Sequence, residues 1–149
     1  MKDRLIWSIF WALVGVFIIA VCAMAIPAFG ELVMGLLFIA IAGAVFLVLG
    51  GVLIFLTVRQ KVGGLIKKFL LLTGASAVGI PVSVFLHNAV YGLFIYFFGE
   101  GFWSGGDEPF FFIMGVIVCP LGFLVGVVGN IVLVIRRRGI VSGVSSAST

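Results

Sequence analysis

The stretch FLLLTGASAVGIPVSVFLHNAVYGLFIYFF, Phe69–Phe98, decides the fold. It runs for 30 residues without an Asp, Glu, Lys or Arg, and a helix that crosses about 30 Å of hydrocarbon needs about 20 apolar residues. Lipid offers no hydrogen-bond partners to the backbone and no alternating strand pattern is present, so we expect this stretch to be a helix. Pro81 near its middle predicts a kink, because proline removes a backbone donor and crowds the preceding turn.

Three further charge-free stretches meet the same length test. The chain is 64% hydrophobic and 9% charged, whereas soluble globular chains are about 45–50% apolar and about 25% charged. This composition excludes a soluble enzyme or a soluble binding module, and two cysteines in 149 residues exclude a disulfide-stapled secreted scaffold. We therefore predict an all-α, polytopic integral membrane protein, a bundle of four transmembrane helices. Its single domain is expected at residues 1–138, with spans at 5–26, 32–58, 69–98 and 110–135 and a short flexible cytoplasmic tail at 139–149.

The first span has a second interpretation. Lys2 and Arg4, the apolar run and Ala23-Met24-Ala25 resemble a cleavable signal peptide with a small-x-small site. The apolar run is about 20 residues long, against about 7–15 for a signal peptide. We therefore expect this segment to be retained as the first helix.

The charged residues predict the orientation of the chain. All nine basic residues fall on one side of the predicted bundle, and four of the five acids fall on the other. Basic residues next to spans stay cytoplasmic. We therefore expect the protein in the cell membrane (the plasma membrane or a bacterial-type inner membrane), with both termini on the cytoplasmic side. The basic side would lie against anionic lipid headgroups, so the net charge of +4 requires no nucleic-acid partner. The residues given this role are Arg59, Lys61, Lys67, Lys68, Arg136, Arg137 and Arg138.

Polar residues gather on one side of the third span. At about 100° per residue, Ser76 and Ser83 fall within about 40° of His87, and the opposite side is apolar. We expect the polar face to meet other helices and the apolar face to meet lipid. The predicted polar intramembrane set is Ser76, Ser83, His87, Asn88 and Tyr91, with Asn130 of the fourth span expected to hydrogen-bond across helices.

Small residues form a stripe along the fourth span. Gly115, Cys119, Gly122, Gly126 and Gly129 recur at spacings of 4, 3, 4 and 3. Small residues let two helix backbones approach closely, which replaces the missing hydrophobic drive inside lipid. Two interpretations stay open: packing within one chain, or a contact between copies.

Few residues could bind a ligand inside the membrane. His87 is the only histidine, and Cys22 and Cys119 are expected at a similar depth in the outer half of the bilayer. They lack the local spacing of a zinc site, and a single histidine cannot supply both axial ligands of a haem. We expect no cofactor and a His87 hydrogen-bonded to a neighbouring backbone or hydroxyl group. Haem or a metal at His87 is the alternative.

The connection at 99–109 is acidic. Glu100, Asp107 and Glu108 could bind a hard cation through oxygen ligands, although their spacing matches no calcium loop. The aromatic residues around them are typical of the belt at a membrane interface.

Three functions follow from these features. The leading hypothesis is a structural or accessory membrane protein that associates with itself or docks onto another integral membrane protein. The first alternative is a channel or carrier for a small solute or ion lined by the polar face. The second is a haem or quinone anchor at His87. An enzyme is not expected, because the spans hold no nucleophile–base or carboxylate pair.

Overall fold

The computed structural model describes residues 2–26, 36–103 and 108–146, and the regular structure in these ranges is helical. Four stretches of it, 4–25, 37–59, 64–98 and 109–137, are long and apolar enough to cross a membrane. The predicted all-α fold with four long apolar helices is therefore confirmed. The elements are α1 (Lys2–Ala25), α3 (Leu36–Arg59), α4 (Gly64–Phe98), η2 (Glu100–Trp103), α5 (Pro109–Ile113), the π-helical η3 (Met114–Val118) and α6 (Cys119–Ser146).

The helices extend beyond the charge-free stretches. α4 begins at Gly64, five residues before the predicted span, and includes Lys67 and Lys68. α6 continues to Ser146, into the segment for which the sequence predicts a flexible tail. Charge limits how far a segment enters hydrocarbon, whereas helical hydrogen bonding continues into the interface. The predicted connection at 27–31 lies outside the described residues.

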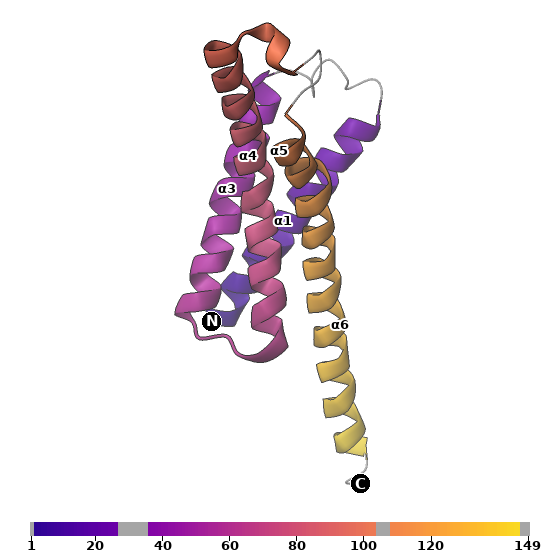
Figure 1. Ribbon diagram of the computed structural model, residues 1–149. Coiled ribbons are helices and arrows are strands. Elements are labelled where there is room, and N and C mark those ends of the chain that lie inside the picture. Colours follow the sequence, from indigo (N-terminus) through magenta and orange to yellow (C-terminus); the bar gives the residue numbers. More distant parts are fainter. Residues whose placement is uncertain (1, 27–35, 104–107, 147–149) are drawn as a thin grey trace.

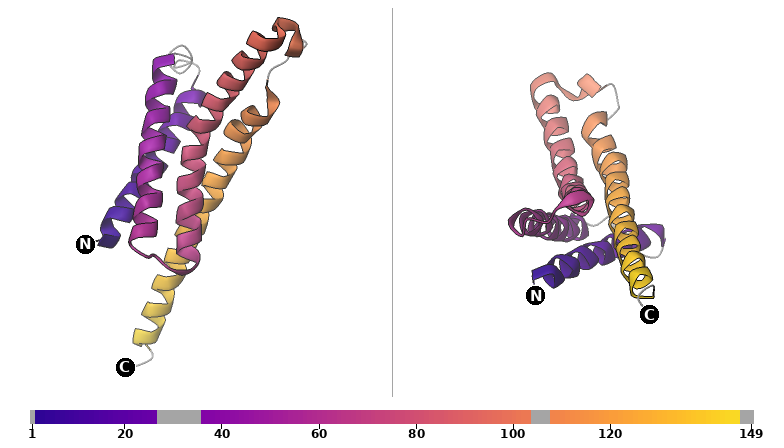
Figure 2. Two further views of the ribbon diagram at one scale, coloured as in Figure 1. Left: turned by 60° about the vertical axis from the view of Figure 1, so that its left-hand side comes forward. Right: turned by 90° about the horizontal axis from the view of Figure 1, so that it is seen from below.

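α4 lies between α3 and α6 and runs antiparallel to both (Figure 1). α1 packs against α3 and crosses the bundle obliquely. The C-terminal part of α6, in yellow, extends well past the ends of the other helices (Figure 2). α4 therefore joins α3 to α6, and α1 is attached mainly through α3.

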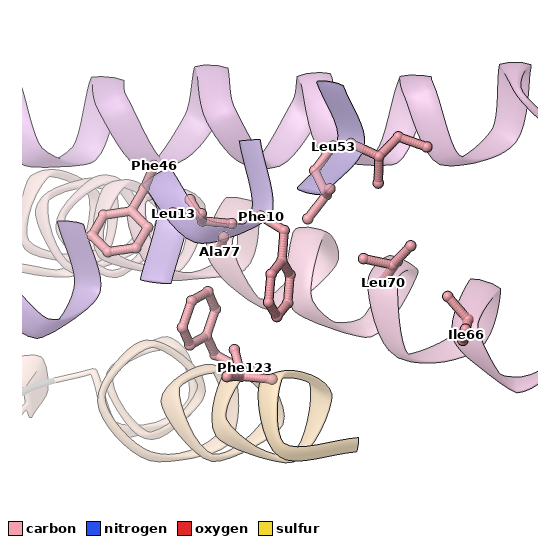
Figure 3. Packing of buried hydrophobic residues seen from close by; sticks show 10 residues of the cluster. Phe10, Leu13, Phe46, Leu53, Ile66, Leu70, Ala77 and Phe123 are labelled. Carbon is pink, nitrogen blue, oxygen red and sulfur yellow. The ribbon is translucent and has the colours of Figure 1, made fainter. Parts of the chain in front are cut away.

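Aromatic rings join α1, α3 and α6 in the core. Phe123 of α6 stacks on Phe17 of α1 with centroids 4.5 Å apart. Phe46 of α3 meets both rings edge-on at 6.4 and 6.5 Å. Phe10 and Leu13 of α1 are fully buried beside them (Figure 3). Because lipid tails are as apolar as these side chains, the rings stabilise the bundle by van der Waals packing and ring geometry.

Glycines bring α3 and α4 close together. A Cβ atom added at Gly50 of α3 would lie 2.9 Å from the Gly74 carbonyl oxygen of α4. One added at Gly74 would lie 2.7 Å from Ile54 Cγ1. Val78 lies nine residues before His87, on the opposite, apolar face that we expect to meet lipid, and in the structure it lies against Gly50. The apolar face of α4 is thus covered in part by α3.

Two prolines lie inside the long helices, with different effects. α4 stays one helix through Pro81, at the middle of its 35 residues, and it changes direction about half way along (Figure 2). The last span widens into the π-helix Met114–Val118, which ends two residues before Pro120. Pro120 has no N–H group and its ring crowds the carbonyl four residues earlier, so the wider turn relieves the conflict. Pro120 was the signal for this irregularity, which the sequence analysis missed.

We predict that Gly74→Ala destabilises the protein and that Gly51→Ala does not. The added methyl at Gly74 would overlap Ile54, and overpacking of this kind costs about 1–3 kcal/mol. Gly51 is the control because a Cβ there meets nothing within 4 Å. Thermal unfolding in detergent checks this. Equal midpoints for the two variants would contradict the close approach of α3 and α4.

Candidate functional site

The polar face of α4 and the glycine stripe of α6 pack against each other. A Cβ atom added at Gly122 would lie 2.6 Å from Ser76 Oγ, and one added at Gly115 would lie 3.1 Å from Ser83 Cβ. One added at Gly126 would overlap the Thr73 hydroxyl. We call this contact the α4–α6 seam. Its pairs, in order along α4, are Phe69 with Gly129, Thr73 with Gly126, Ser76 with Gly122, Gly79 with Cys119, and Ser83 with Gly115.

In this structure the stripe packs within one chain. All five residues of the stripe lie against α4 side chains or backbone of the same molecule. Cys119 is buried there against Gly79, and Cys22 is exposed on α1. In this structure the stripe is therefore covered by α4 of the same chain.

The predicted polar face of α4 is divided in the structure. Ser76 and Ser83 are buried in the seam, and His87 and Tyr91 are half-buried. Asn88 is exposed, and its Nδ2 donates to the Val84 carbonyl oxygen at 2.8 Å. One residue along a helix turns the side chain by about 100°, so Asn88 leaves the face that His87 occupies.

Fully buried polar side chains bond to their own helices. Thr57 Oγ1 donates to the Leu53 carbonyl oxygen at 2.7 Å, and Thr73 Oγ1 donates to that of Phe69 at 2.9 Å. Asn130 Nδ2 donates to the Gly126 carbonyl oxygen at 2.9 Å. The hydrogen bond that Asn130 makes in the structure is therefore within α6 rather than across helices, because the carbonyl one turn earlier is within reach. Its buried Oδ1 has no partner in the described part of the chain.

His87 and Glu108 meet where α5 begins. His87 Nδ1 lies 3.0 Å from the backbone oxygen of Glu108 and 3.3 Å from its carboxylate Oε2. Glu108 is only 4% exposed and is the N-cap of α5. Its carboxylate accepts from the N–H groups of Phe110 at 2.8 Å and Phe111 at 2.9 Å. Both oxygens near Nδ1 are acceptors, so this ring nitrogen carries the proton. We call this arrangement the His87–Glu108 latch.

The latch corrects the expectation for Glu108. The sequence placed Glu108 among loop acids that could bind a cation, whereas its carboxylate is turned inward to α5 and His87. Pro109 directly after it was the available signal, because proline favours the first position of a helix and marks the preceding residue as its cap. Glu100 is exposed, and Asp107 lies outside the described residues. Within the described ranges, no group of three His, Cys, Asp or Glu side chains could hold a metal.

The basic residues whose side chains are described gather at the opposite end of the bundle. They lie at the start of α1, the end of α3, the start of α4 and on α6 after its buried part. Arg59 lies over the Phe55 ring at 5.6 Å. Arg59, Lys61, Lys68, Arg136 and Arg137 are exposed, Lys67 is half-buried, and the Arg138 side chain is outside the described part.

These contacts attach the last span to α4. The latch joins α5 to α4 through hydrogen bonds between His87 and Glu108, and the seam joins α4 to α6 through close packing. Together they tie the last span to α4 along most of its length.

Comparisons with known proteins give no match, neither to a protein-family model, nor to a curated protein, nor to a solved structure.

We predict that the effects of His87→Ala and Glu108→Ala on stability are not additive. Glu108→Ala removes a helix cap, which costs about 0.5–2 kcal/mol, together with the partner of His87. The double variant should lose less than the sum of the single variants, with a coupling energy of about 0.5–3 kcal/mol. Glu108→Gln, which keeps one cap oxygen, should lose less than Glu108→Ala.

Thermal unfolding of the four proteins in one detergent measures this coupling. Glu100→Ala is the matched control, because this nearby acid is exposed. Strict additivity of the two single substitutions would show that the latch carries no interaction energy.

Proposed function

We propose that this chain is a small multi-pass membrane protein of accessory type. It has both termini on the cytoplasmic side of the cell membrane, and it works by helix–helix contact with a second copy of itself or with another integral membrane protein. Its immediate surroundings are the lipid bilayer. No nucleic acid, cofactor or catalytic group enters the proposal.

The single observation that carries the proposal is the exposure of Asn88 on a candidate span. Its amide lies on the outer surface of α4, whereas Ser76 and Ser83 of the same helix are buried in the seam. Lipid cannot bond to an amide, so a polar side chain on a membrane helix favours contact with another protein. One N–H of Asn88 goes to Val84, which leaves the second N–H and the carbonyl oxygen for a partner.

The residues around Asn88 suit a close helix contact. Ala89 and Gly92 are exposed beside it, and a Cβ added at Gly92 would meet nothing within 4 Å. Phe85, 71% exposed, lies one turn earlier. We call these four residues the Asn88 face. In a two-fold dimer the two amides can donate to and accept from each other, and the small residues let the backbones approach.

The two alternative functions have no comparable observation in their favour. The serines expected to line a path lie against glycines of α6, and the groove described below is apolar. For haem or a metal at His87, the described residues include no group of three His, Cys, Asp or Glu side chains that could hold a metal ion.

We predict that Asn88→Leu combined with Gly92→Leu abolishes most self-association. An interhelical amide bond contributes about 0.6–2 kcal/mol in membranes, and leucine at Gly92 separates the backbones. Energy transfer between donor- and acceptor-labelled copies in liposomes, at fixed protein-to-lipid ratio, measures the change. Gly51→Leu is the control, since the site has free space and lies on α3.

Two results would contradict the proposal that the chain associates with a second copy of itself. One is energy transfer in the wild type no higher than for a monomeric reference. The other is equal energy transfer in the wild type and in the double variant. Co-purification from native membranes then tests the partner arm: a second membrane protein that is retained by wild type and lost with the double variant supports it. Equal retention of that protein by the two contradicts a role of the Asn88 face.

The orientation has its own test. Cysteines introduced at Lys61 and Gly101, in a background without Cys22 and Cys119, should differ in their reaction with a membrane-impermeant thiol reagent applied to intact cells. We expect labelling at position 101 and not at 61. The reverse pattern would overturn the assignment of the termini to the cytoplasm.

A further inference from the structure

An apolar groove runs along the α4–α6 seam near the basic end of the bundle. It has a volume of about 400 Å³, is open to the outside of the bundle, and is lined by Phe69, Leu124, Val125, Val128 and Gly129. The Phe69 ring, packed against Gly129, forms its inner wall. In a membrane such a groove is filled by an acyl chain or by another protein.

Two cations lie on the groove side of their helices. Arg136 follows Gly129 by seven residues and Val125 by eleven, and both spacings return to the same face of a helix. Lys68 directly precedes Phe69 and lies one turn before Leu72, whose Cδ1 comes within 3.8 Å of the Cβ position of Gly122. Both cations are exposed. Lys67 and Arg137, one residue away from each, fall on other sides of the helices.

The first turn of α4 adds positive potential to the same place. The N-cap residue, Gly63, has no side chain to accept from the first N–H groups of the helix. These groups carry the positive end of the helix dipole and suit an anion. In the antiparallel pairing of the seam, Phe69 stands opposite Gly129. Arg136, seven residues further along α6, therefore reaches the level of this first turn.

We propose that the groove binds one acyl chain of an anionic phospholipid whose phosphate is held between Lys68, Arg136 and the start of α4. The charge arrangement selects this occupant. A protein helix would leave the two cations and the helix terminus without a counter-charge, whereas an anionic lipid supplies the apolar chain and the anion together. A zwitterionic lipid fills the groove equally well but gains less from the cations.

The dimensions fit a lipid in its normal position in the membrane. Arg136 lies about 10 Å along α6 from Gly129, at 1.5 Å per residue. A headgroup layer adds about 5–8 Å on each side of the hydrocarbon. A phosphate at the level of Arg136 therefore places the part of the acyl chain nearest the headgroup beside Gly129. The rest of the chain then lies along Val128 and Val125.

Native mass spectrometry of the full chain in detergent, titrated with phosphatidylglycerol or phosphatidylcholine of identical chains, tests the proposal. We expect one phosphatidylglycerol to bind about tenfold or more tightly than phosphatidylcholine. Lys68→Gln with Arg136→Gln should reduce this preference to about twofold or less. Lys67→Gln with Arg137→Gln removes the same charge from the same helices and should leave the preference intact.

A second pair of variants tests the groove itself. Val128→Trp should fill it and weaken the first binding event of both lipids, whereas Val48→Trp, at an exposed position of α3 outside the groove, should not. Inorganic phosphate at millimolar concentration should leave lipid binding unchanged. Displacement of phosphatidylglycerol by inorganic phosphate would show a site that recognises the anion alone, which would contradict the lipid proposal. Equal affinity of wild type for the two lipids, or equal loss in the two double variants, would overturn the proposal.

Discussion

The close approach of α4 to both of its neighbours is the constraint on which the structure depends. Inside lipid, apolar side chains gain little by leaving their surroundings, so helices associate through short backbone distances and dense packing. Gly50 and Gly74 provide this against α3, and Gly122 and Gly126 provide it against α6. α4 therefore meets glycines of a neighbouring helix on two sides, and bulky exposed residues are left for the remaining surface.

This constraint also determines what the polar residues do. Where glycine faces serine across the seam, the hydroxyl fills the space that a larger side chain would need. Thr57 and Thr73 are fully buried, and their hydroxyl groups donate to carbonyl groups one turn earlier in the same helix. These hydroxyl groups therefore need no hydrogen-bond acceptor from a neighbouring helix. The seam ends at Ser83 and Gly115, and beyond it the two segments are joined by the hydrogen bonds of the His87–Glu108 latch. Packing and electrostatics thus act in succession along one helix pair.

Most of the fold could be predicted from the sequence, and much of the site could not. Charge-free length identifies a span directly, and the 4-3-4-3 spacing of the glycines identifies a packing face. Neither shows which helix the face meets, because several faces of α3, α4 and α6 carry small residues. The sequence predicted Glu108 as a loop acid because a loop acid and a helix-capping acid cannot be told apart by residue type alone. Pro109, at the first position of the helix, was the signal that identified Glu108 as the cap. Asn88 is next to His87 in the sequence, but its side chain is exposed whereas that of His87 is half-buried.

The two ends of the α4–α6 pair have different chemistry, and this follows from the same charge separation that predicts the topology. At one end a buried carboxylate meets a histidine and a helix N-terminus. At the other end, cations flank the N-terminus of α4, which has no side-chain cap. Each of these helix starts needs an anion nearby, because its first N–H groups have no partner in the helix. The chain supplies that anion to α5 as Glu108. For α4 the N-cap residue Gly63 supplies no such group, and in our proposal the phosphate of an anionic lipid provides it.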